Sequence, residues 1–411
     1  MTCSGGEIGI HVSLRCLWGD PCGFESRPEH HPLGNLRRGK RGRFFFFDFP
    51  ARMKYVIYQK IGHSARNQQG EFDIMQNIDW SSLGFRYMKT NSHIRYTWRN
   101  GAWDKGELVK DDTFQISIAA SALHYGQAAF EGLKVFRCKD GKVRAFRPQA
   151  NAERMHRTAI RTCMAPVEAD MFMDALKRVV NDNLDYIPPY GTGGSLYIRP
   201  LLIGSGPQIG VAPADEYTFF IMVMPVGPYY KGGLKPVSAA IYDDYDRAAP
   251  KGVGHVKVAG NYAASLYAHE AAKHAGFPVE LYLDAKSHKF VEEFATSNFF
   301  GIKPDGTYVT PDSTSVLPSV TNNTLKQLAA DLGMAVETRP IPFEELETFA
   351  EIGACGTAVV VTPVSDITRG DKVIKLPTGD KCGPYSEKLY HAVQDIQYGV
   401  TPDTHNWCVE L

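Results

Sequence analysis

The chain has 411 residues, of which 44% are hydrophobic, 22% charged and 11% aromatic. Lysine plus arginine and aspartate plus glutamate each number 45, so the formal net charge is zero and does not favour a nucleic acid or an anionic membrane surface as partner. The sequence has no apolar run near the roughly 18 residues that span a bilayer. Length and composition therefore predict a globular protein of two or three domains.

The eight cysteines form no CxxC pair and show no regular spacing. In a chain of this length, such a pattern is typical of reduced thiols in a cytosolic compartment. We therefore expect a cytoplasmic protein.

Residues 1–74 differ in character from the rest of the chain. They include HPLGNLRRGKRGRFFFFDFPAR, which combines a basic cluster with aromatic residues and shows no helical or strand period. The segment could be a disordered arm or a transit peptide, although its acidic residues oppose the second interpretation. Our preferred hypothesis is a mis-annotated N-terminal extension, with the natural start at Met75.

The sequence from 94 to 226 predicts hairpins, helices and buried strands. Strands at Ile94–Trp98 and Gly106–Val109 flank the turn dipeptide Asn100-Gly101, and LKVFRCKDGKVRAFR (133–147) forms a second hairpin that turns at Asp140-Gly141. Two helices are expected in NAERMHRTAIRTCM and ADMFMDALKRVVNDNL. SLYIRPLLIG (195–204) and YTFFIMVMPV (217–226) are almost continuously apolar, which predicts buried strands.

GPYYKGGLKP (227–236) is rich in glycine and proline, which favours an interdomain connection. The elements expected beyond it are a strand at 237–242, a helix near 261–275 that ends at Gly276, strands VELYL, SNFFGI and YVTP, a helix at 321–332 that ends at Gly333, strand AVETRPI, short helix FEELETFA, and strands through GTAVVVTPVSDI. These elements predict a mixed α+β fold with a small N-terminal α/β domain at 75–226, a loop at 227–236 and a larger C-terminal domain at 237–411.

Lys257 lies in an unusual setting for a lysine, between Val256 and Val258 and before Ala259 and Gly260. Partial burial lowers the pKa of an ammonium group, and a neutral amine can attack a carbonyl to form a Schiff base. The alternative, an ordinary solvated side chain, is more common for a single lysine.

Two motifs are not expected to carry chemistry. GSGPQIG (204–210) is similar to a dinucleotide-binding loop, but Pro207 lies inside it and VAPADEY follows where a helix is required. HEAAKH (269–274) is similar to a zinc-protease helix, but its histidines are five residues apart and do not share a helix face. We expect no metal site.

Three segments could bind an anion. Val320 and Thr321 begin a helix, where free backbone N–H groups attract negative charge, although Thr321 could simply cap the helix. Thr357 follows a glycine in ACGTAVVV and offers amides and a hydroxyl. Arg154 could add a positive charge or could be an exposed helix arginine.

FVEEFATSNFF places the carboxylates of Glu292 and Glu293 next to each other. Strand alternation sends them to opposite faces, so we expect one to be solvated and the other to point inward. A buried carboxylate needs a cationic or hydrogen-bonding partner, and a protonated pyridine nitrogen is one.

Seven blocks in this order resemble the fold-type IV pyridoxal-phosphate enzymes, and specifically the branched-chain amino acid aminotransferases, from about residue 78 to 400. The blocks are LHYGQAAFEGLKVFR (123–137), ERMHRTA (153–159), SLYIRPLLIG (195–204), KVAGNY (257–262), EEFATSNFF (292–300), LPSVT (317–321) and GTAVVVTPVSDI (356–367). The resemblance implies a large domain with a mixed β-sheet or barrel core, pyridoxal 5'-phosphate as cofactor, and a homodimer with a shared active site.

The resemblance also implies roles for individual residues. Lys257 would hold the cofactor through a Schiff base and move the proton, Tyr262 would bond to the ring oxygen, and Glu293 would pair with the ring nitrogen. The further cofactor-binding residues would be Arg154, Thr296, Val320, Thr321 and Thr357. The substrate-binding residues would be Tyr125, Phe130, Tyr197, Arg199, Thr357 and Ala358, with Tyr197 reaching the site from the neighbouring subunit.

The activity implied is reversible amino transfer between leucine, isoleucine or valine and 2-oxoglutarate by a ping-pong route. D-amino acid aminotransferases and aminodeoxychorismate lyases share the fold and the lysine, and a non-catalytic cofactor-binding protein is a further alternative. The long segments LHYGQAAFEGLK and GPYYKGGLKPV favour the branched-chain enzymes, and the presence of both Lys257 and Glu293 disfavours a non-catalytic protein.

Overall fold

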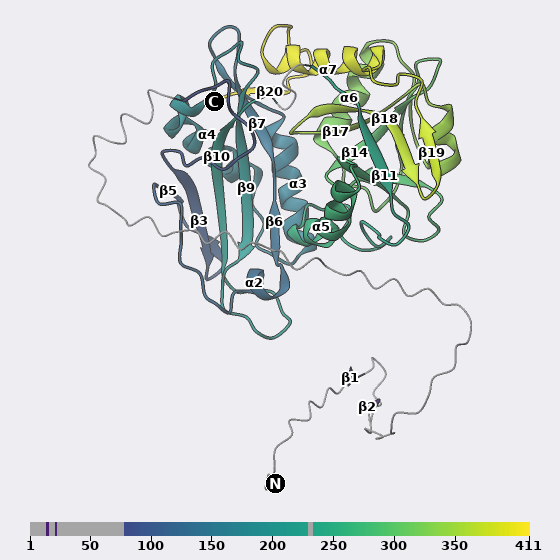
Figure 1. Ribbon diagram of the computed structural model, residues 1–411. Coiled ribbons are helices and arrows are strands. Elements are labelled where there is room, and N and C mark those ends of the chain that lie inside the picture. The colour runs from purple at the N-terminus through teal and green to yellow at the C-terminus, as the bar shows by residue number, and fades with distance from the viewer. Residues whose placement is uncertain (1–13, 16–20, 23–77, 229–232) are drawn as a thin grey trace. The chain divides into compact units, whose positions relative to one another are not determined.

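The computed structural model describes residues 14–15, 21–22, 78–228 and 233–411 (Figure 1). The chain divides into two compact units, residues 1–65 and 66–411. In the first unit, β1 (Leu14–Arg15) pairs antiparallel with β2 (Pro21–Cys22). The rest of the expected extension, and residues 229–232 of the expected interdomain loop, lie outside the described residues. Within the described part of the chain, no helix has the length and apolar character needed to cross a membrane.

An antiparallel sheet of nine strands forms the first half of the second unit, in the order β20-β8-β7-β9-β10-β3-β4, with β5 paired to β3 and β6 to β9. The strands are β3 (His93–Arg99), β4 (Ala102–Trp103), β5 (Glu107–Val109), β6 (Ala128–Phe130), β7 (Leu133–Arg137), β8 (Val143–Phe146), β9 (Ser195–Gly204), β10 (Tyr217–Val226) and β20 (Cys408–Glu410). The predicted strands at 195–204 and 217–226 are confirmed as β9 and β10, which lie side by side (Figure 1).

Both predicted hairpins are confirmed. β3 turns into β4 through Asn100 and Gly101, whose φ angles of 53° and 82° are left-handed, and β7 turns into β8 with Gly141 at a φ of 81°. Asparagine and glycine tolerate this conformation better than other residues, which is why the turns form at these dipeptides.

Helices α3 (Pro148–Arg161) and α4 (Ala169–Asp182) pack against this sheet, close to their predicted bounds. Both present an apolar stripe to the sheet, so that Met155, Phe172 and Leu176 share one buried cluster with strand residues such as Leu196 and Phe219. A short α2 (Ser121–Tyr125) and a 3-10 turn at Leu184–Tyr186 were not predicted.

The second sheet also has nine strands, in the order β13-β12-β11-β18-β17-β14-β15-β16, with β19 on β18. A further pairing of β13 with β14 closes six of these strands into a barrel. The strands are β11 (Val237–Ile241), β12 (Val279–Leu283), β13 (Val291–Phe294), β14 (Ser297–Ile302), β15 (Tyr308–Pro311), β16 (Val336–Arg339), β17 (Glu351–Gly356), β18 (Val360–Arg369) and β19 (Lys372–Lys375). Parallel and antiparallel pairs are mixed, which confirms the predicted fold class.

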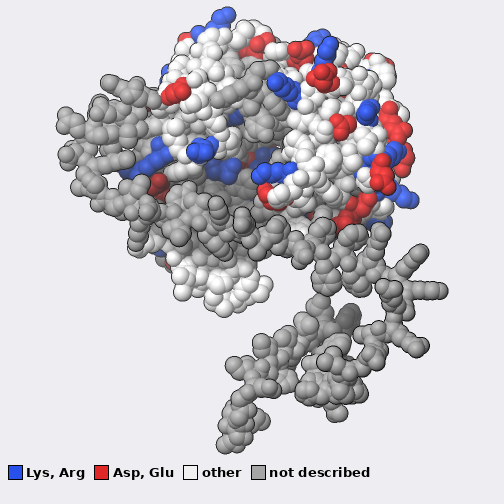
Figure 2. Space-filling model, in the orientation of Figure 1, with Lys and Arg blue, Asp and Glu red and all other residues white. Residues whose placement is uncertain are grey.

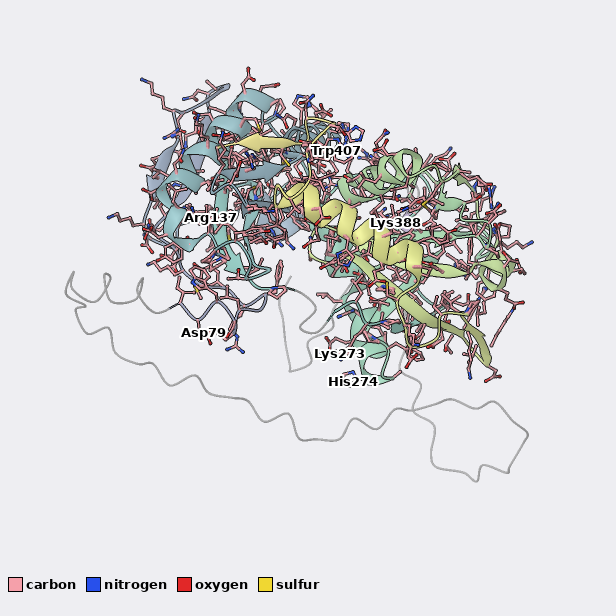
Figure 3. All side chains as sticks on the ribbon, turned by 90° about the horizontal axis from the view of Figure 1, so that it is seen from above. Asp79, Arg137, Lys273, His274, Lys388 and Trp407 are labelled. Carbon is pink, nitrogen blue, oxygen red and sulfur yellow. The ribbon has the colours of Figure 1, made fainter. Side chains whose placement is uncertain are left out.

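The helices of the second half are α5 (Ala259–His274), α6 (Val320–Asp331), α7 (Pro384–Gln397) and a 3-10 helix at Phe343–Thr348. α6 and α7 lie together against β17 and β18 (Figure 1) and bury Leu325 and Leu389 on a cluster that includes Phe300 and Tyr308. α7, which carries Lys388 in Figure 3, was not predicted.

The predicted alternation of Glu292 and Glu293 is wrong. Leu281 of β12 lies opposite Phe294 and Leu283 opposite Val291, so the register slips by one residue between these pairs. Such a bulge interrupts the alternation of side chains. As a result both glutamates are buried, each with 3% of its surface exposed, and neither is solvated.

Substitution of Glu351 tests how much a buried charge at the start of α7 contributes to the stability of the protein. The Glu351 carboxylate accepts bonds from the amides of Tyr385 and Ser386, at 3.0 and 2.8 Å, at the start of α7. Glu351→Gln should lower the free energy of unfolding by about 1–3 kcal/mol in urea titrations, because one oxygen acceptor and the charge are lost. Glu387→Gln, an exposed residue in the first turn of the same helix, is the control, and an equal loss in both variants would contradict this account.

Candidate active site

A cavity of about 770 Å³ lies where the first sheet meets α5, α6 and the barrel strands. Among the described residues that line it, the basic side chains are Arg154, Arg199 and Lys257, and none is acidic. Figure 2 shows Lys and Arg side chains gathering in the hollowed part of the face in view. The cavity wall is therefore suited to an anionic ligand.

Lys257 lines this cavity. It lies immediately before Val258, the N-cap of α5. Its backbone is fixed by a bond from its amide to the Thr158 hydroxyl, at 3.1 Å, and by a bond from the Phe130 amide to its carbonyl. Its Nζ donates to the Tyr262 hydroxyl at 2.7 Å and lies 4.7 Å from the centre of the Phe130 ring. Lys257 is thus held against aromatic groups rather than being an ordinary solvated lysine.

Glu293 is buried and does not itself line the cavity, although two of its partners, Leu317 and Asn298, do. Its carboxylate pairs with Arg247 at 2.7 Å, accepts the Leu317 amide at 2.8 Å and accepts the Asn298 side chain at 3.2 Å. Burial raises the pKa of Glu293 to about 7, although Arg247, the Leu317 amide and the charge of Lys257 oppose this shift. This carboxylate can therefore share a proton near neutral pH.

The first turn of α6 reaches the cavity through Val320. Ser319 is the N-cap, and its hydroxyl accepts the Asn322 amide at 3.1 Å, so the alternative that Thr321 caps the helix is wrong. Thr321 lines a neighbouring cavity of about 20 Å³ that shares Val320 and Thr357 with the main one. The Ser319 side chain caps the Asn322 amide, and the two amides before it, those of Val320 and Thr321, are suited to bind an anion.

Arg154 of α3 is buried with 5% exposure, so the alternative of an exposed helix arginine is wrong. Its Nε and Nη2 donate to the two oxygens of Glu131, at 2.7 and 2.8 Å. Its Nη1 donates to the Pro318 carbonyl, at 2.8 Å, just before α6. The arginine therefore joins the first sheet to the loop that begins α6.

The turn from β17 into β18 presents Thr357 and Ala358 to the cavity. The Thr357 hydroxyl donates to the Gly132 carbonyl at 3.2 Å, and Lys134 Nζ donates to the Ala358 carbonyl at 2.9 Å. Burial lowers the pKa of Lys134 to about 8. Val360 ends the turn with a φ of 62°, which is strained for a β-branched residue, so these outside bonds help to hold the turn in shape.

Besides Thr357 and Ala358, three of the four other residues predicted to bind substrate line the cavity: Phe130, Tyr197 and Arg199. Arg199 donates to the Tyr197 hydroxyl at 2.9 Å and lies over the Phe130 ring, and its buried Nε has no hydrogen-bond partner among the described residues. Tyr197 lines the cavity of its own chain, so the expectation that it comes from a neighbouring subunit is wrong.

Tyr125, the fourth, does not line the cavity. It lies at the end of α2 with 46% of its surface exposed, and its hydroxyl bonds to the Ile209 carbonyl. Thr296 lines the cavity, in the turn between β13 and β14.

Sequence reasoning missed four residues that shape this site: Phe85, Glu131, Lys134 and Arg247. Phe85 lines the cavity and meets Tyr197 edge to face, with 4.7 Å between ring centres. Glu131 and Lys134 lie inside the block LHYGQAAFEGLKVFR, where a charged residue beside apolar strand positions was an available signal. Nothing local to Arg247 indicates that it faces Glu293.

The histidines of HEAAKH lie apart from this site. His269 contacts Glu280 at 3.1 Å, whereas His274 is exposed at the end of α5 next to Lys273 (Figure 3) and contacts the Glu270 carbonyl. Among the described residues, no group of three or more His, Cys, Asp or Glu side chains is arranged to hold a metal ion.

Three known proteins that are similar to this chain in sequence or in structure carry the same name. A branched-chain-amino-acid aminotransferase of Haemophilus influenzae is 47% identical over 82% of this chain and 100% of that protein. A branched-chain-amino-acid aminotransferase of Helicobacter pylori is 43% identical over 82% of this chain and 99% of its own length. Among solved structures, the branched-chain amino acid aminotransferase of Escherichia coli has a TM-score of 0.65 and 27% identity, over 77% of this chain and 98% of that one.

The model of the amino-transferase class IV family matches residues 128–367, which span the cavity residues from Phe130 to Thr362. With this match and relatives of 47% and 43% identity over nearly their whole length, the chain belongs to the class IV aminotransferase family.

Proposed function

We propose that this chain transfers an amino group reversibly between leucine, isoleucine or valine and 2-oxoglutarate, with pyridoxal 5'-phosphate as cofactor. The observation that carries the proposal is the setting of Lys257. It is the single lysine among the described residues that line the cavity, and its Nζ bonds to Tyr262 at 2.7 Å. The names of the two bacterial relatives support the choice of branched-chain substrates.

The residues present fit the proposed cofactor at both of its ends. At one end, Arg154 and the amides of Val320 and Thr321 provide donors for a phosphate, with the Thr357 hydroxyl beside them. At the other end, the carboxylate of Glu293, whose pKa is about 7, can pair with a ring nitrogen. Lys257 lies on the wall of the same cavity. Its amine must lie there if it is to reach the aldehyde of the cofactor.

Pyridoxal 5'-phosphate, when bound, supplies an aldehyde for the amino group and a ring that accepts electrons. The chain supplies the proton transfers and the orientation. Lys257 Nζ would take the proton from the substrate Cα and return it, with Tyr262 holding Nζ in place. Arg247 would keep Glu293 facing the ring nitrogen, because both are buried and paired at 2.7 Å.

The two substrates would use different parts of the wall. Phe85, Phe130 and Tyr197 form an aromatic surface that suits a branched apolar side chain. The side-chain carboxylate of 2-oxoglutarate would bind Arg199, whose buried Nε has no partner in the part of the chain that the structure describes. The amides of Thr357 and Ala358 would receive the carboxylate that both substrates share.

Lys257→Ala tests the proposed reaction directly. Glutamate formation from leucine and 2-oxoglutarate should fall by at least about 10³-fold, because the group that moves the proton is lost. The control is Lys251→Ala, an exposed lysine six residues earlier, which should keep the wild-type rate. A wild-type protein that releases pyruvate from aminodeoxychorismate, and forms no glutamate from leucine, would assign the site to the lyase reaction instead.

The raised pKa of Glu293 predicts a pH-dependent stability of the protein stripped of cofactor. Between its ordinary value of 4.5 and about 7, the folded chain keeps a proton that the unfolded chain has released. The free energy of unfolding should therefore fall by up to about 3 kcal/mol as the pH rises through this window, and stay lower above it. Urea titrations should show this fall in wild type and in Glu344→Gln, an exposed control, but not in Glu293→Gln. Parallel profiles for all three proteins would refute it.

We further propose that the chain forms a homodimer, and that it acts in the cytoplasm. α2 with the residues just before it, and the loop after β9, expose large apolar side chains, with Ile118 and Val211 90% exposed and Leu123 and Ile209 near 60%. The bond from Tyr125 to Ile209 joins the two segments into one surface. Exposed apolar residues in this number favour a protein interface, and a second copy of the chain is the partner that supports a shared site.

Val211→Asp should convert the dimer to a monomer, because a charge would be buried at the interface without a partner. Sedimentation velocity at micromolar concentration is the measurement. Val373→Asp on β19, where the valine is 50% exposed, is the control and should leave the mass unchanged. A monomeric wild type, or a dimer that survives Val211→Asp, would contradict the assignment of this surface.

A further inference from the structure

Glu131 is a fully buried carboxylate to which the proposed mechanism gives no part. It lies directly after β6, between the cavity residues Phe130 and Gly132, and has 0% of its surface exposed. Its backbone amide donates to the Pro200 carbonyl at 2.9 Å, so its position on the sheet is fixed. Burial of a carboxylate is strongly unfavourable unless it is paired, and its partners therefore indicate its role.

Every oxygen of Glu131 bonds to a group near the phosphate end of the cavity. Oε1 accepts Arg154 Nε at 2.7 Å, and Oε2 accepts Arg154 Nη2 at 2.8 Å. Oε2 also accepts Asn151 Nδ2 at 2.8 Å. The bidentate contact with Arg154 fixes the plane of the guanidinium as well as its position, which a single hydrogen bond would not do.

The pair is ionised at neutral pH. Burial by itself would raise the pKa of Glu131, but the charge and hydrogen bonds of Arg154, followed by the charge of Lys257 and the bond from Asn151, outweigh it and lower the pKa. The carboxylate thus holds Arg154 whether or not an anion is present in the cavity.

The contacts of Arg154 leave a defined set of donors. A guanidinium has five N–H groups, and Arg154 uses one on Nε and one on Nη2 for Glu131 and one on Nη1 for the Pro318 carbonyl. One N–H on each terminal nitrogen remains. Arg154 lines the cavity together with Ser319 and Val320 at the start of α6, so these two N–H groups can receive an anion bound there.

We propose that Glu131 is a positioning residue, which holds the guanidinium of Arg154 so that the two remaining N–H groups of Arg154 bind the phosphate of the cofactor. The inference rests on the proposed function, since it presumes that the cavity binds a phosphorylated pyridoxal. It predicts that Glu131 acts on the phosphate alone and leaves the rest of the ligand unaffected.

Glu131→Asp tests the proposal, because it keeps the charge and shortens the side chain by one methylene, so the carboxylate no longer reaches both nitrogens in the same place. The readout is the ratio of the dissociation constants of pyridoxal and pyridoxal 5'-phosphate, measured by fluorescence titration of the cofactor-stripped protein. Affinity for the phosphorylated form should fall about tenfold while that for pyridoxal stays unchanged. A general structural defect would weaken both ligands together.

Asn151→Ala provides a milder variant, which removes one bond to Glu131 and leaves the carboxylate in place. It should lower the same ratio about threefold, and it decides the question if Glu131→Asp does not fold. Glu351→Asp, the same change at a buried carboxylate that caps α7, is the control and should leave the ratio unchanged.

Two results would overturn the proposal: a ratio that stays at the wild-type value in both Glu131→Asp and Asn151→Ala, or an equal loss of affinity for both ligands. Failure of the proposed function gives a different result. In that case the wild-type protein itself would bind pyridoxal 5'-phosphate no more tightly than pyridoxal.

Discussion

The structure depends on how two buried arginines and one half-buried lysine are bonded. Arg154 and Arg247 lie in the interior, where an unpaired charge costs several kcal/mol, and Lys134 is half-buried. Two of them have carboxylate partners, Glu131 and Glu293, and Lys134 donates to a carbonyl. The two ion pairs join residues 23 and 46 positions apart, whereas the bonds from Lys134 to Ala358 and from Arg154 to Pro318 bring segments more than a hundred residues apart to one place.

The loop before α6 shows how closely these pairs are linked. The Pro318 carbonyl accepts a hydrogen bond from the guanidinium of Arg154. The amide of the adjacent Leu317 donates to the Glu293 carboxylate, and the Leu317 carbonyl accepts a hydrogen bond from the side chain of Asn298. One pair of neighbouring residues therefore connects the end of the cavity suited to a phosphate with the end suited to a ring nitrogen. A shift of this loop would disturb both ends together, which favours a rigid loop over a mobile one.

Much of this architecture could be predicted from the sequence, and the parts that could not have physical reasons. β9 and β10 are almost continuously apolar and the hairpins turn at Asn-Gly and Asp-Gly, so local chemistry alone indicated them. The motif blocks brought Lys257, Tyr262 and Arg154 to one cavity. The bulge at Glu292 and Glu293 depends on how β13 pairs with β12, which no local pattern reports.

Other differences between prediction and structure have different causes. Arg247 lies in a loop, and only the packed structure shows that its charge faces Glu293 from 46 positions earlier in the chain. α7 and β20 went unpredicted although their hydrophobic spacing is ordinary. Tyr125 lies on the surface of a single copy of the chain, and its assignment to substrate binding, made by resemblance to a family, stays a prediction.

β20 has a consequence for the order in which the protein is made. It comprises Cys408–Glu410, which follow the barrel in the chain, and it pairs with β8 at the edge of the first sheet. The ribosome synthesises the chain from its N-terminus, so this edge of the sheet stays unpaired until β20 has been translated. An unpaired edge is open to pairing with other chains. The first sheet, although encoded early, therefore reaches its final form only after the barrel has been translated.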